Sequence, residues 1–409
     1  MKVLIIGGGA SGMMAALSAA GTRENTVILL ERQARLGKKL MATGNGRCNL
    51  TNRALEPSRY HGADAGFALP ALRRFGTERA LAFFAGLGLL TVTEENGKVY
   101  PLSDQANSVV DVLRFALDAR GVQTVCSCDV VEVKKKARGY QALAATGERY
   151  FGDKLIVCCG GWAGKKLGGS RAGYHLLSQF GHSCTPLYPC LTQLCTDPTW
   201  VRALKGVRAD AALTLLQNSV PAAQSAGELQ FTDFGVSGPE AFAVSRAASV
   251  FSGRQALQLD FLRAWPEEAV LTLLKRRQAG FPALAAEELL SGMLQARLGK
   301  TIVRRCGIDG RKPLAELAQE ELLRCARMIK CFCLDVTGVM GFDSAQVTAG
   351  GVPTAEFDAQ TLESRLSPGV YAAGEVLDID GDCGGFNLQW AWASGYVAGQ
   401  LGKAEENAL

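Results

Sequence analysis

The first twelve residues constrain the fold of this chain more than any other stretch. Val3 to Ile6 is a continuous aliphatic run, typical of a strand buried on both faces of a parallel sheet. Gly7, Gly9 and Gly12 follow at G-x-G-x-x-G spacing, which allows a tight turn, backbone approach to a pyrophosphate and packing of helix on strand. A helix beginning there presents free N–H groups to phosphates. The stretch therefore predicts a dinucleotide-binding β-α unit.

A second aliphatic run supports this interpretation. Val27 to Leu30 ends at Glu31, nineteen residues after Gly12, close to where the fingerprint places a carboxylate on the adenosine ribose hydroxyls. The same glycines could form a loop that binds nothing, but the strand before, the helix after and the acid at this distance favour binding. These residues leave open whether the dinucleotide is NAD or FAD.

Composition excludes several classes of protein. A length of 409 residues suggests about two or three domains. The 44 Lys and Arg residues are spread evenly among 39 Asp and Glu residues, which gives little sign of a nucleic-acid-binding face. Thirteen cysteines without a C-x-x-C pair, together with only three histidines, assemble no zinc signature. We therefore expect a small-molecule substrate, no nucleic acid and no bound metal; the oligomeric state is left unknown.

The start of the chain and its apolar runs bear on location. Met1 and Lys2 lead directly into the first strand, without the apolar segment and cleavage site of a secretory signal. The longest mostly apolar stretch, Ala80 to Val92, is too short to span a bilayer. The sequence predicts a cytoplasmic protein without a membrane partner.

Regular elements alternate with loops over the first 186 residues. The polar stretch from Gly37 to Asn52 predicts a second phosphate-facing loop, with an exposed linker as the alternative. Helices are expected over Leu69 to Gly86 and Asp104 to Arg120, the latter capped by Asp104. A strand over Val122 to Val133 should open an antiparallel meander. A further buried strand, Lys154 to Cys159, ends at Gly160 and Gly161.

The pattern of expected secondary structure changes from about residue 187. Residues 187–264 are rich in strand-like runs, and residues 265–330 show helical spacing. Glycine-rich segments return from residue 345, and a helix is expected over Leu388 to Leu401. The prediction is an α/β fold: a Rossmann-like, glutathione-reductase-type domain formed by residues 1–186 and 345–409, with residues 187–344 inserted as a β-rich plus helical substrate or cap domain.

Motifs along nearly the whole chain resemble one family, the BaiN-like NAD(P)/FAD-dependent flavoproteins. This family includes bile-acid reductases of gut bacteria and aminoacetone oxidases. The matching segments are G-G-G-A-S-G at Gly7, T-G-N-G-R-C-N-L-T-N at Thr43, C-G-G at Cys159, F-T-D-F-G-V-S-G-P at Phe231, V-T-A-G-G-V at Val347 and A-G-E-V-L-D-I-D-G at Ala373. The G-R-C-N-x-T-N and G-E-V-L-D segments are specific, whereas the first motif alone is not.

The resemblance implies FAD as the cofactor, with NAD(P)H as a transient electron donor that binds without a Rossmann domain of its own. FAD would lie extended, its adenosine at the first glycines and its isoalloxazine between the nucleotide domain and the insert. The residues implied to bind it are Gly7, Gly9, Ala10, Ser11, Gly12, Glu31, Arg32, Lys39, Gly44, Asn45, Gly46, Arg47, Cys48, Gly160, Gly161, Gly374, Glu375, Asp380, Gly385, Asn387 and Leu388.

Four positions have competing interpretations. Asp233 stands where the resemblance leads us to expect a histidine, so it is a catalytic candidate. The alternative is a solvent-exposed or helix-capping acid. Cys48 is read as a packed thiol rather than a redox group, because no second cysteine lies at C-x-x-C spacing. Asp378 and Asp380 could bind ribityl hydroxyls or order the glycine loop.

The resulting functional prediction is an FAD-dependent oxidoreductase that transfers hydride through flavin N5. NAD(P)H-dependent reduction of a conjugated C=C bond in a 3-oxo steroid or bile-acid-like molecule is preferred by analogy with the family. One alternative is an amine oxidase of the aminoacetone type that produces hydrogen peroxide, and a second is a non-redox flavoprotein that binds RNA.

Overall fold

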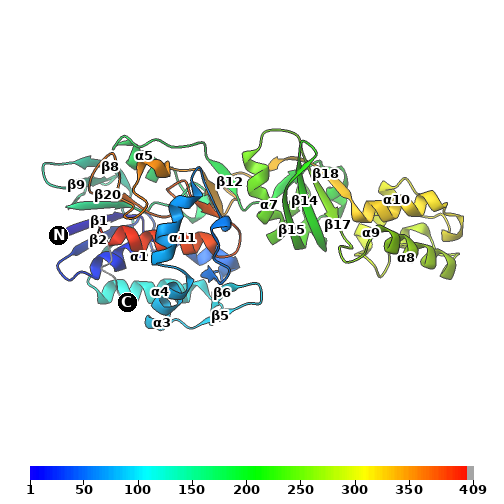
Figure 1. Cartoon of the computed structure of the whole chain (residues 1–409), viewed down its shortest axis with the longest axis horizontal. Helices are drawn as coiled ribbons and strands as arrows, with labels where there is room; N and C mark the ends of the chain where they lie inside the picture. Colours follow the sequence, from blue (N-terminus) through cyan, green and yellow to red (C-terminus); the bar gives the residue numbers. More distant parts are fainter. Residues whose placement is uncertain (403–409) are drawn as a thin grey trace. The chain divides into compact units, whose positions relative to one another are not determined.

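The computed structural model describes residues 1–402, which divide into two compact units. Unit 1 contains Met1–Tyr188 and the chain from Gln346 onward, and unit 2 contains Pro189–Ala345. Each unit has a separate cluster of buried apolar side chains, so each has a hydrophobic core of its own. Figure 1 shows the elements of both units.

Unit 1 contains a parallel sheet of five strands, in the spatial order β20 (Val370–Ala372), β11 (Lys154–Val157), β1 (Lys2–Ile6), β2 (Thr26–Leu30) and β7 (Gln123–Val125). The first strand therefore lies in the middle, and the chain extends the sheet to one side before crossing to the other. This is the order of a doubly wound Rossmann-type sheet. The predicted Rossmann-like α/β class is confirmed.

Two helices of unit 1 pack on each other through their backbones. α1 (Ala10–Ala20) follows β1, and α11 (Phe386–Gly399) is contributed by the far end of the chain. A Cβ at Gly395 would lie 2.3 Å from the Ser11 carbonyl oxygen, and one at Gly399 would lie 2.5 Å from that of Ala15. Glycine at these positions therefore lets α11 approach α1 closely. Figure 1 shows both helices beside the parallel sheet.

Smaller elements surround this sheet. The remaining helices of unit 1 are α2 (Leu69–Arg74), α3 (Thr77–Gly86), α4 (Ala106–Ala119) and α5 (Ala172–Ser178). An antiparallel meander contains β8 (Val130–Lys135), β9 (Tyr140–Ala144) and β10 (Arg149–Gly152), and a second small sheet contains β3 (Thr51–Asn52), β6 (Lys98–Pro101) and β5 (Thr91–Thr93). Short strands also occur at β4 (Tyr60–His61), β21 (Asp380–Gly381), β12 (Tyr188–Cys190) and β19 (Val347–Ala349).

Three expected elements of unit 1 differ in the structure. The helix predicted over Leu69 to Gly86 is two helices, because the chain leaves the helical conformation at Phe75 and restarts after Gly76. The strand predicted over Val122 to Val133 is also two, β7 in the parallel sheet and β8 in the meander. Asp104 does not cap α4, since Gln105 is the residue before the helix and Asp104 has a positive φ of 56°.

Unit 2 contains a closed barrel of six strands, in the order β13 (Leu194–Thr196), β16 (Gly235–Ser237), β15 (Val220–Phe231), β14 (Arg208–Gln217), β17 (Gln255–Asp260) and β18 (Phe332–Val339). The longest pair is the β14–β15 hairpin, in which burial alternates along β14 as expected for a strand with one face in a core. Closure pairs all neighbouring strands, which leaves the barrel without a free edge.

Along the sequence, the helical part of unit 2 lies between β17 and β18, two strands that are neighbours in the barrel. α8 (Glu267–Gly280), α9 (Ala296–Arg305) and α10 (Gln319–Lys330) follow β17, and β18 then returns to pair with both β17 and β13. Two further helices, α6 (Pro198–Val201) and α7 (Pro239–Val250), belong to the barrel part. The strand that closes the barrel therefore comes after the helices. The sequence predicted a β-rich part followed by a helical part, without this returning strand.

Candidate dinucleotide-binding site

The fingerprint glycines differ in the space around them, and the difference matches their expected roles. A Cβ at Gly7, whose φ is 105°, would lie 2.4 Å from the Cys158 carbonyl oxygen, and a Cβ at Gly12 would lie 1.8 Å from that of Gly7. These two positions have no room for a side chain. A Cβ at Gly9 would meet no atom within 4 Å. Gly9 also precedes the first residue of α1, so the open space adjoins a helix N-terminus that suits a phosphate.

Glu31 follows β2 and lies against the glycine turn. One carboxylate oxygen accepts a hydrogen bond from the Gly8 backbone N–H at 2.6 Å, and the other accepts from Gln33 N–H at 2.6 Å. The carboxylate is thereby fixed beside the first turn, where the fingerprint expects an acid for ribose hydroxyls. Its neighbour Arg32 donates to the Gly168 carbonyl oxygen at 2.9 Å.

The predicted second loop contains a distorted 3₁₀ helix, Leu40–Gly46. Gly44 and Asn45 both have positive φ within it, at 57°, and a Cβ at Gly46 would meet no atom within 4 Å. The loop therefore exposes backbone at Gly46 in the same way as at Gly9. Cys48 is fully buried, and burial raises the pKa of its thiol to about 12. Such a thiol is a packing group rather than a nucleophile.

Arg47 is directed to acidic side chains rather than left free for a ligand. Its guanidinium pairs with Glu94 at 3.0 Å and with Asp104, and it lies 4.0 Å from the centroid of the Tyr100 ring. The hydrogen bond to Asp104 raises the pKa of Arg47 further. In this structure the residue orders the loop, and the expected contact with the cofactor stays a prediction.

Lys39 and Glu375 connect the second loop to the segment after β20. Their charged groups are 2.8 Å apart, and the other Glu375 oxygen accepts the Thr348 N–H at 2.8 Å. Gly161 faces this pair, because a Cβ there would lie 2.4 Å from a Glu375 carboxylate oxygen. Gly160, with φ of 69°, again has no atom within 4 Å of its ideal Cβ. Three segments distant in sequence therefore meet here.

The N-terminus of α11 ties the remaining predicted residues together. Gly385 precedes the helix with a φ of 100°, and Asn387 bonds through its side chain to both the N–H and the carbonyl oxygen of Gly381. The indole N–H of Trp390 donates to the Gly374 carbonyl oxygen at 3.2 Å. The indole N–H of Trp392 donates to the Leu50 carbonyl oxygen at 2.9 Å. The helix therefore fixes the loops of residues 40–50 and 374–385 from one side.

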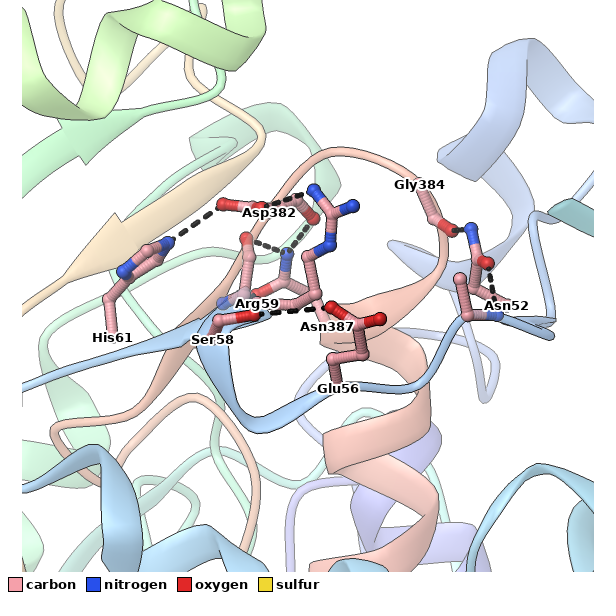
Figure 2. A network of polar contacts seen from close by, with 10 residues as sticks. Asn52, Glu56, Ser58, Arg59, His61, Asp382, Gly384 and Asn387 are labelled. Atoms are coloured by element: carbon pink, nitrogen blue, oxygen red, sulfur yellow. Dashed lines mark hydrogen bonds and ion pairs between the residues drawn. The ribbon is translucent and has the colours of Figure 1, made fainter. Parts of the chain in front are cut away.

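A cluster that the sequence did not reveal lies beside this helix start. Asp382 accepts a hydrogen bond from His61, with 2.7 Å between Nε2 and Oδ1, and pairs with Arg59 at 3.3 Å. Figure 2 shows these side chains reaching the Asp382 carboxylate next to Asn387, while Asn52 bonds to the Gly384 carbonyl oxygen. The acidic run D-I-D-G-D was visible, but nothing local to it points to a partner more than three hundred residues earlier.

Asp233 belongs to unit 2 and has the properties of a surface acid. Its side chain is 48% exposed, and Lys205 Nζ lies 2.9 Å from one carboxylate oxygen. The hydrogen bond from Lys205 holds the pKa of Asp233 below its usual value. A carboxylate of this kind carries no proton at neutral pH, which does not favour a general acid.

The remaining thiols and carboxylates form no metal site within residues 1–402, where no three His, Cys, Asp or Glu side chains gather to hold an ion. Burial raises the pKa of Cys159 to about 12, and that of Cys158 higher still. In the same part of the chain no helix has both the length and the apolar character to cross a membrane.

Open backbone positions therefore recur at Gly9, which precedes α1, at Gly46 in the second loop, and at Gly160, beside the Gly161 that faces Glu375. Backbone donors, a helix N-terminus and a few side-chain charges are what a dinucleotide pyrophosphate requires. The residues present fit an extended dinucleotide such as FAD.

Comparison with known proteins agrees with this geometry. The profile of the HI0933-like protein Rossmann domain matches residues 1–401. A 3-dehydro-bile acid delta(4,6)-reductase of Clostridium scindens is 40% identical over 98% of this chain and 98% of its own. A ribosomal RNA dihydrouridine synthase of Escherichia coli is 29% identical over 97% of this chain and 96% of its own.

Solved structures are more distant. A 3-ketosteroid delta1-dehydrogenase of Sterolibacterium denitrificans matches 97% of this chain and 98% of its own with 12% identity and a TM-score of 0.49. The family assignment rests on the sequence relatives and on the matching profile, and it confirms the resemblance predicted from the motifs. The chain belongs to the HI0933-like Rossmann family.

Proposed function

We propose that this oxidoreductase binds FAD and reduces a conjugated C=C bond of a 3-oxo steroid or bile-acid-like molecule, with NAD(P)H as the electron donor. The observation that carries the proposal is 40% identity over 98% of both chains to a 3-dehydro-bile acid delta(4,6)-reductase. A reduction of that kind adds two hydrogens across a C=C bond conjugated with a carbonyl group.

The relatives that act on RNA support the same type of reaction. Dihydrouridine is uridine whose C=C bond, conjugated with a carbonyl, has gained two hydrogens, so the dihydrouridine synthases at 29% and 26% identity perform comparable chemistry on another substrate. Reduction of an activated C=C bond is the common element. The higher identity to the bile-acid reductase, 40% against 29%, supports a steroid substrate over a nucleotide.

The site offers the parts that such a cofactor needs. Bound FAD would supply the hydride, and the chain would supply position and electrostatics. Gly9 and the N-terminus of α1 suit the pyrophosphate, and Glu31 suits the adenosine ribose. The N-terminus of α11 after Gly385 would stabilise the negative charge that a flavin gains on reduction. Lys39 forms an ion pair with Glu375, whose other carboxylate oxygen faces Gly161.

Anaerobic titration of the purified flavoprotein tests this proposal. We expect NADH or NADPH to bleach the flavin absorbance, and a 3-oxo-4-ene steroid to restore it with formation of the saturated product. The matched control is the same steroid without the ring double bond, which should leave the flavin bleached. Bleaching by aminoacetone alone, with hydrogen peroxide formed in air, would replace the proposal with an amine oxidase.

Two further outcomes would also overturn the proposal. Reoxidation by a uridine-containing ribosomal RNA fragment, but by no steroid, would assign an RNA substrate. Purified protein that takes up no flavin after addition of FAD would exclude flavin chemistry altogether.

A further inference from the structure

The cluster of Arg59, His61 and Asp382 has no part in holding the fingerprint segments. Its three side chains come from two stretches far apart in sequence, and Asp382 is the acceptor for both of the others. The carboxylate is 32% exposed and the imidazole 30% exposed, so the cluster lies at the surface of unit 1 without being fully solvated. Figure 2 shows it directly before the first turn of α11.

The backbone fixes this arrangement. β4 and β21 pair antiparallel, with His61 opposite Asp380 and Tyr60 opposite Gly381. The Asp382 N–H donates to the Arg59 carbonyl oxygen at 2.9 Å. His61 is therefore held in register with the loop that leads into α11, rather than reaching it through a mobile side chain.

The imidazole has one nitrogen engaged and one available. Nε2 is bonded to Asp382, whereas Nδ1 has no hydrogen-bond partner within the part of the chain that the structure describes. Figure 2 shows the second ring nitrogen directed away from the carboxylate. A carboxylate bonded to one nitrogen orients the ring and leaves the other ring nitrogen available to a ligand.

The surrounding charges agree with that assignment. Arg59 pairs with Asp382 at 3.3 Å, and the nearby Asp378 accepts the Ala63 N–H at 3.2 Å. Asp380 is opposite His61 and is almost fully buried. Glu56 bonds to Ser58 rather than to the ring, at 3.4 Å. The charged groups around His61 are therefore three carboxylates and one guanidinium.

The other histidines are placed differently. His182 is buried, with both ring nitrogens bonded, to Glu356 at 2.7 Å and to Ser364 at 2.8 Å. His175 is exposed in the last turn of α5. Among the three histidines, His61 alone combines an orienting carboxylate, a second nitrogen without a partner and a position beside the α11 N-terminus.

We propose that His61 donates the proton that completes reduction of the substrate C=C bond, and that Asp382 positions it. This inference rests on the proposed function, in which hydride reaches one carbon of the double bond. The second carbon takes the Nδ1 proton of the imidazolium, the π pair forms the new C–H bond, and His61 becomes neutral. Water then returns a proton to the ring, so that one hydride and one proton are consumed in each turnover.

Separating the two half-reactions tests His61. In the variant His61→Gln, reduction of the flavin by NAD(P)H should be unchanged, while reoxidation of the reduced enzyme by the enone should slow at least about a hundredfold. Bound flavin per chain and the midpoint of thermal unfolding should equal those of the wild type. His175→Gln, at an exposed histidine, is the matched control and should leave both half-reactions unchanged.

Asp382 requires a readout that a merely structural role would not change. Asp382→Asn should move the alkaline limb of the pH profile for reoxidation to lower pH, because the imidazolium loses its counter-charge. Asp382→Glu keeps a carboxylate and should leave the limb closer to its wild-type position. The imidazole proton resonances of the FAD-free protein should show the same displacement in a pH titration.

The outcomes distinguish this inference from the proposed function. If wild-type reduced enzyme is reoxidised by no enone, the proposed function fails. If wild type is reoxidised and His61→Gln is reoxidised equally fast, only the assignment of His61 fails. Loss of flavin or of thermal stability in His61→Gln, with Asp382→Asn leaving the pH profile unmoved, would make the cluster structural and also overturn it.

Discussion

The fingerprint of unit 1 and the barrel of unit 2 differ in the kind of contact that stabilises each of them. At the fingerprint, backbone touches backbone, and a Cβ at Gly12 would lie 1.8 Å from the Gly7 carbonyl oxygen. In unit 2, side chains form the core, and the barrel residue Phe332 is fully buried in contact with the Phe261 ring and the Arg305 guanidinium of α9. A binding site made of backbone depends on which positions lack a side chain, whereas a packed interior depends on side-chain volume.

Replacing fingerprint glycines gives the largest expected effects. Gly12→Ala should lower the free energy of unfolding by about 4 kcal/mol or more, because the new methyl group meets a backbone oxygen that cannot move aside. Thermal unfolding of the purified variant measures this loss. Gly9→Ala is the matched control, since its methyl group meets no atom of the chain.

We expect Gly9→Ala to unfold at the wild-type temperature and yet to bind FAD at least tenfold more weakly, because the methyl group stands where a pyrophosphate approaches. Flavin fluorescence during titration of the FAD-free protein reports the affinity. Wild-type affinity in Gly9→Ala would contradict the placement of the pyrophosphate there.

A substitution in the barrel should show the opposite pattern. Phe332→Ala removes a fully buried ring from the core of unit 2 and should cost about 3 kcal/mol of stability. Because the residue belongs to unit 2, bound flavin per chain should stay at the wild-type level below the unfolding temperature. Phe281→Ala, at a ring that is 58% exposed, is the control and should leave stability nearly unchanged. Flavin loss in Phe332→Ala below its unfolding temperature would show that the two regions are not separable.

Glu31 combines structural and ligand roles, so its replacement should have an intermediate effect. Glu31→Ala leaves the Gly8 and Gln33 N–H groups without their acceptor, which costs about 1–2 kcal/mol. Affinity for FAD should fall roughly tenfold, by about 1.4 kcal/mol, with loss of an acceptor for the ribose hydroxyls. Equilibrium dialysis measures the affinity, and Glu24→Ala, at an exposed carboxylate before the other end of β2, should leave it unchanged. Equal flavin retention in both variants would contradict the assignment of Glu31.

The sequence predicted the fingerprint well because its determinants are local. Strand, turn and helix lie within twenty residues, and the roles of Gly7, Gly9 and Gly12 follow from their spacing. The barrel could not be predicted in this way, since β18 pairs with β17 only after three helices. The His61–Asp382 pair joins residues 321 positions apart, and nothing local to either residue points to the other. Long-range pairing decides both features, and spacing carries no information about it.

The smallest expected effect concerns Asp233 of unit 2. Asp233 is an exposed carboxylate whose pKa is lowered by the hydrogen bond from Lys205, so it loses its interaction only as pH falls into the acid range. At neutral pH it holds no proton to donate. Asp233→Asn should therefore change kcat/KM for enone reduction less than twofold between pH 6 and pH 8, measured beside His61→Gln. A large loss in Asp233→Asn, with His61→Gln unimpaired, would move proton transfer from unit 1 to the barrel and reverse the division of roles between them.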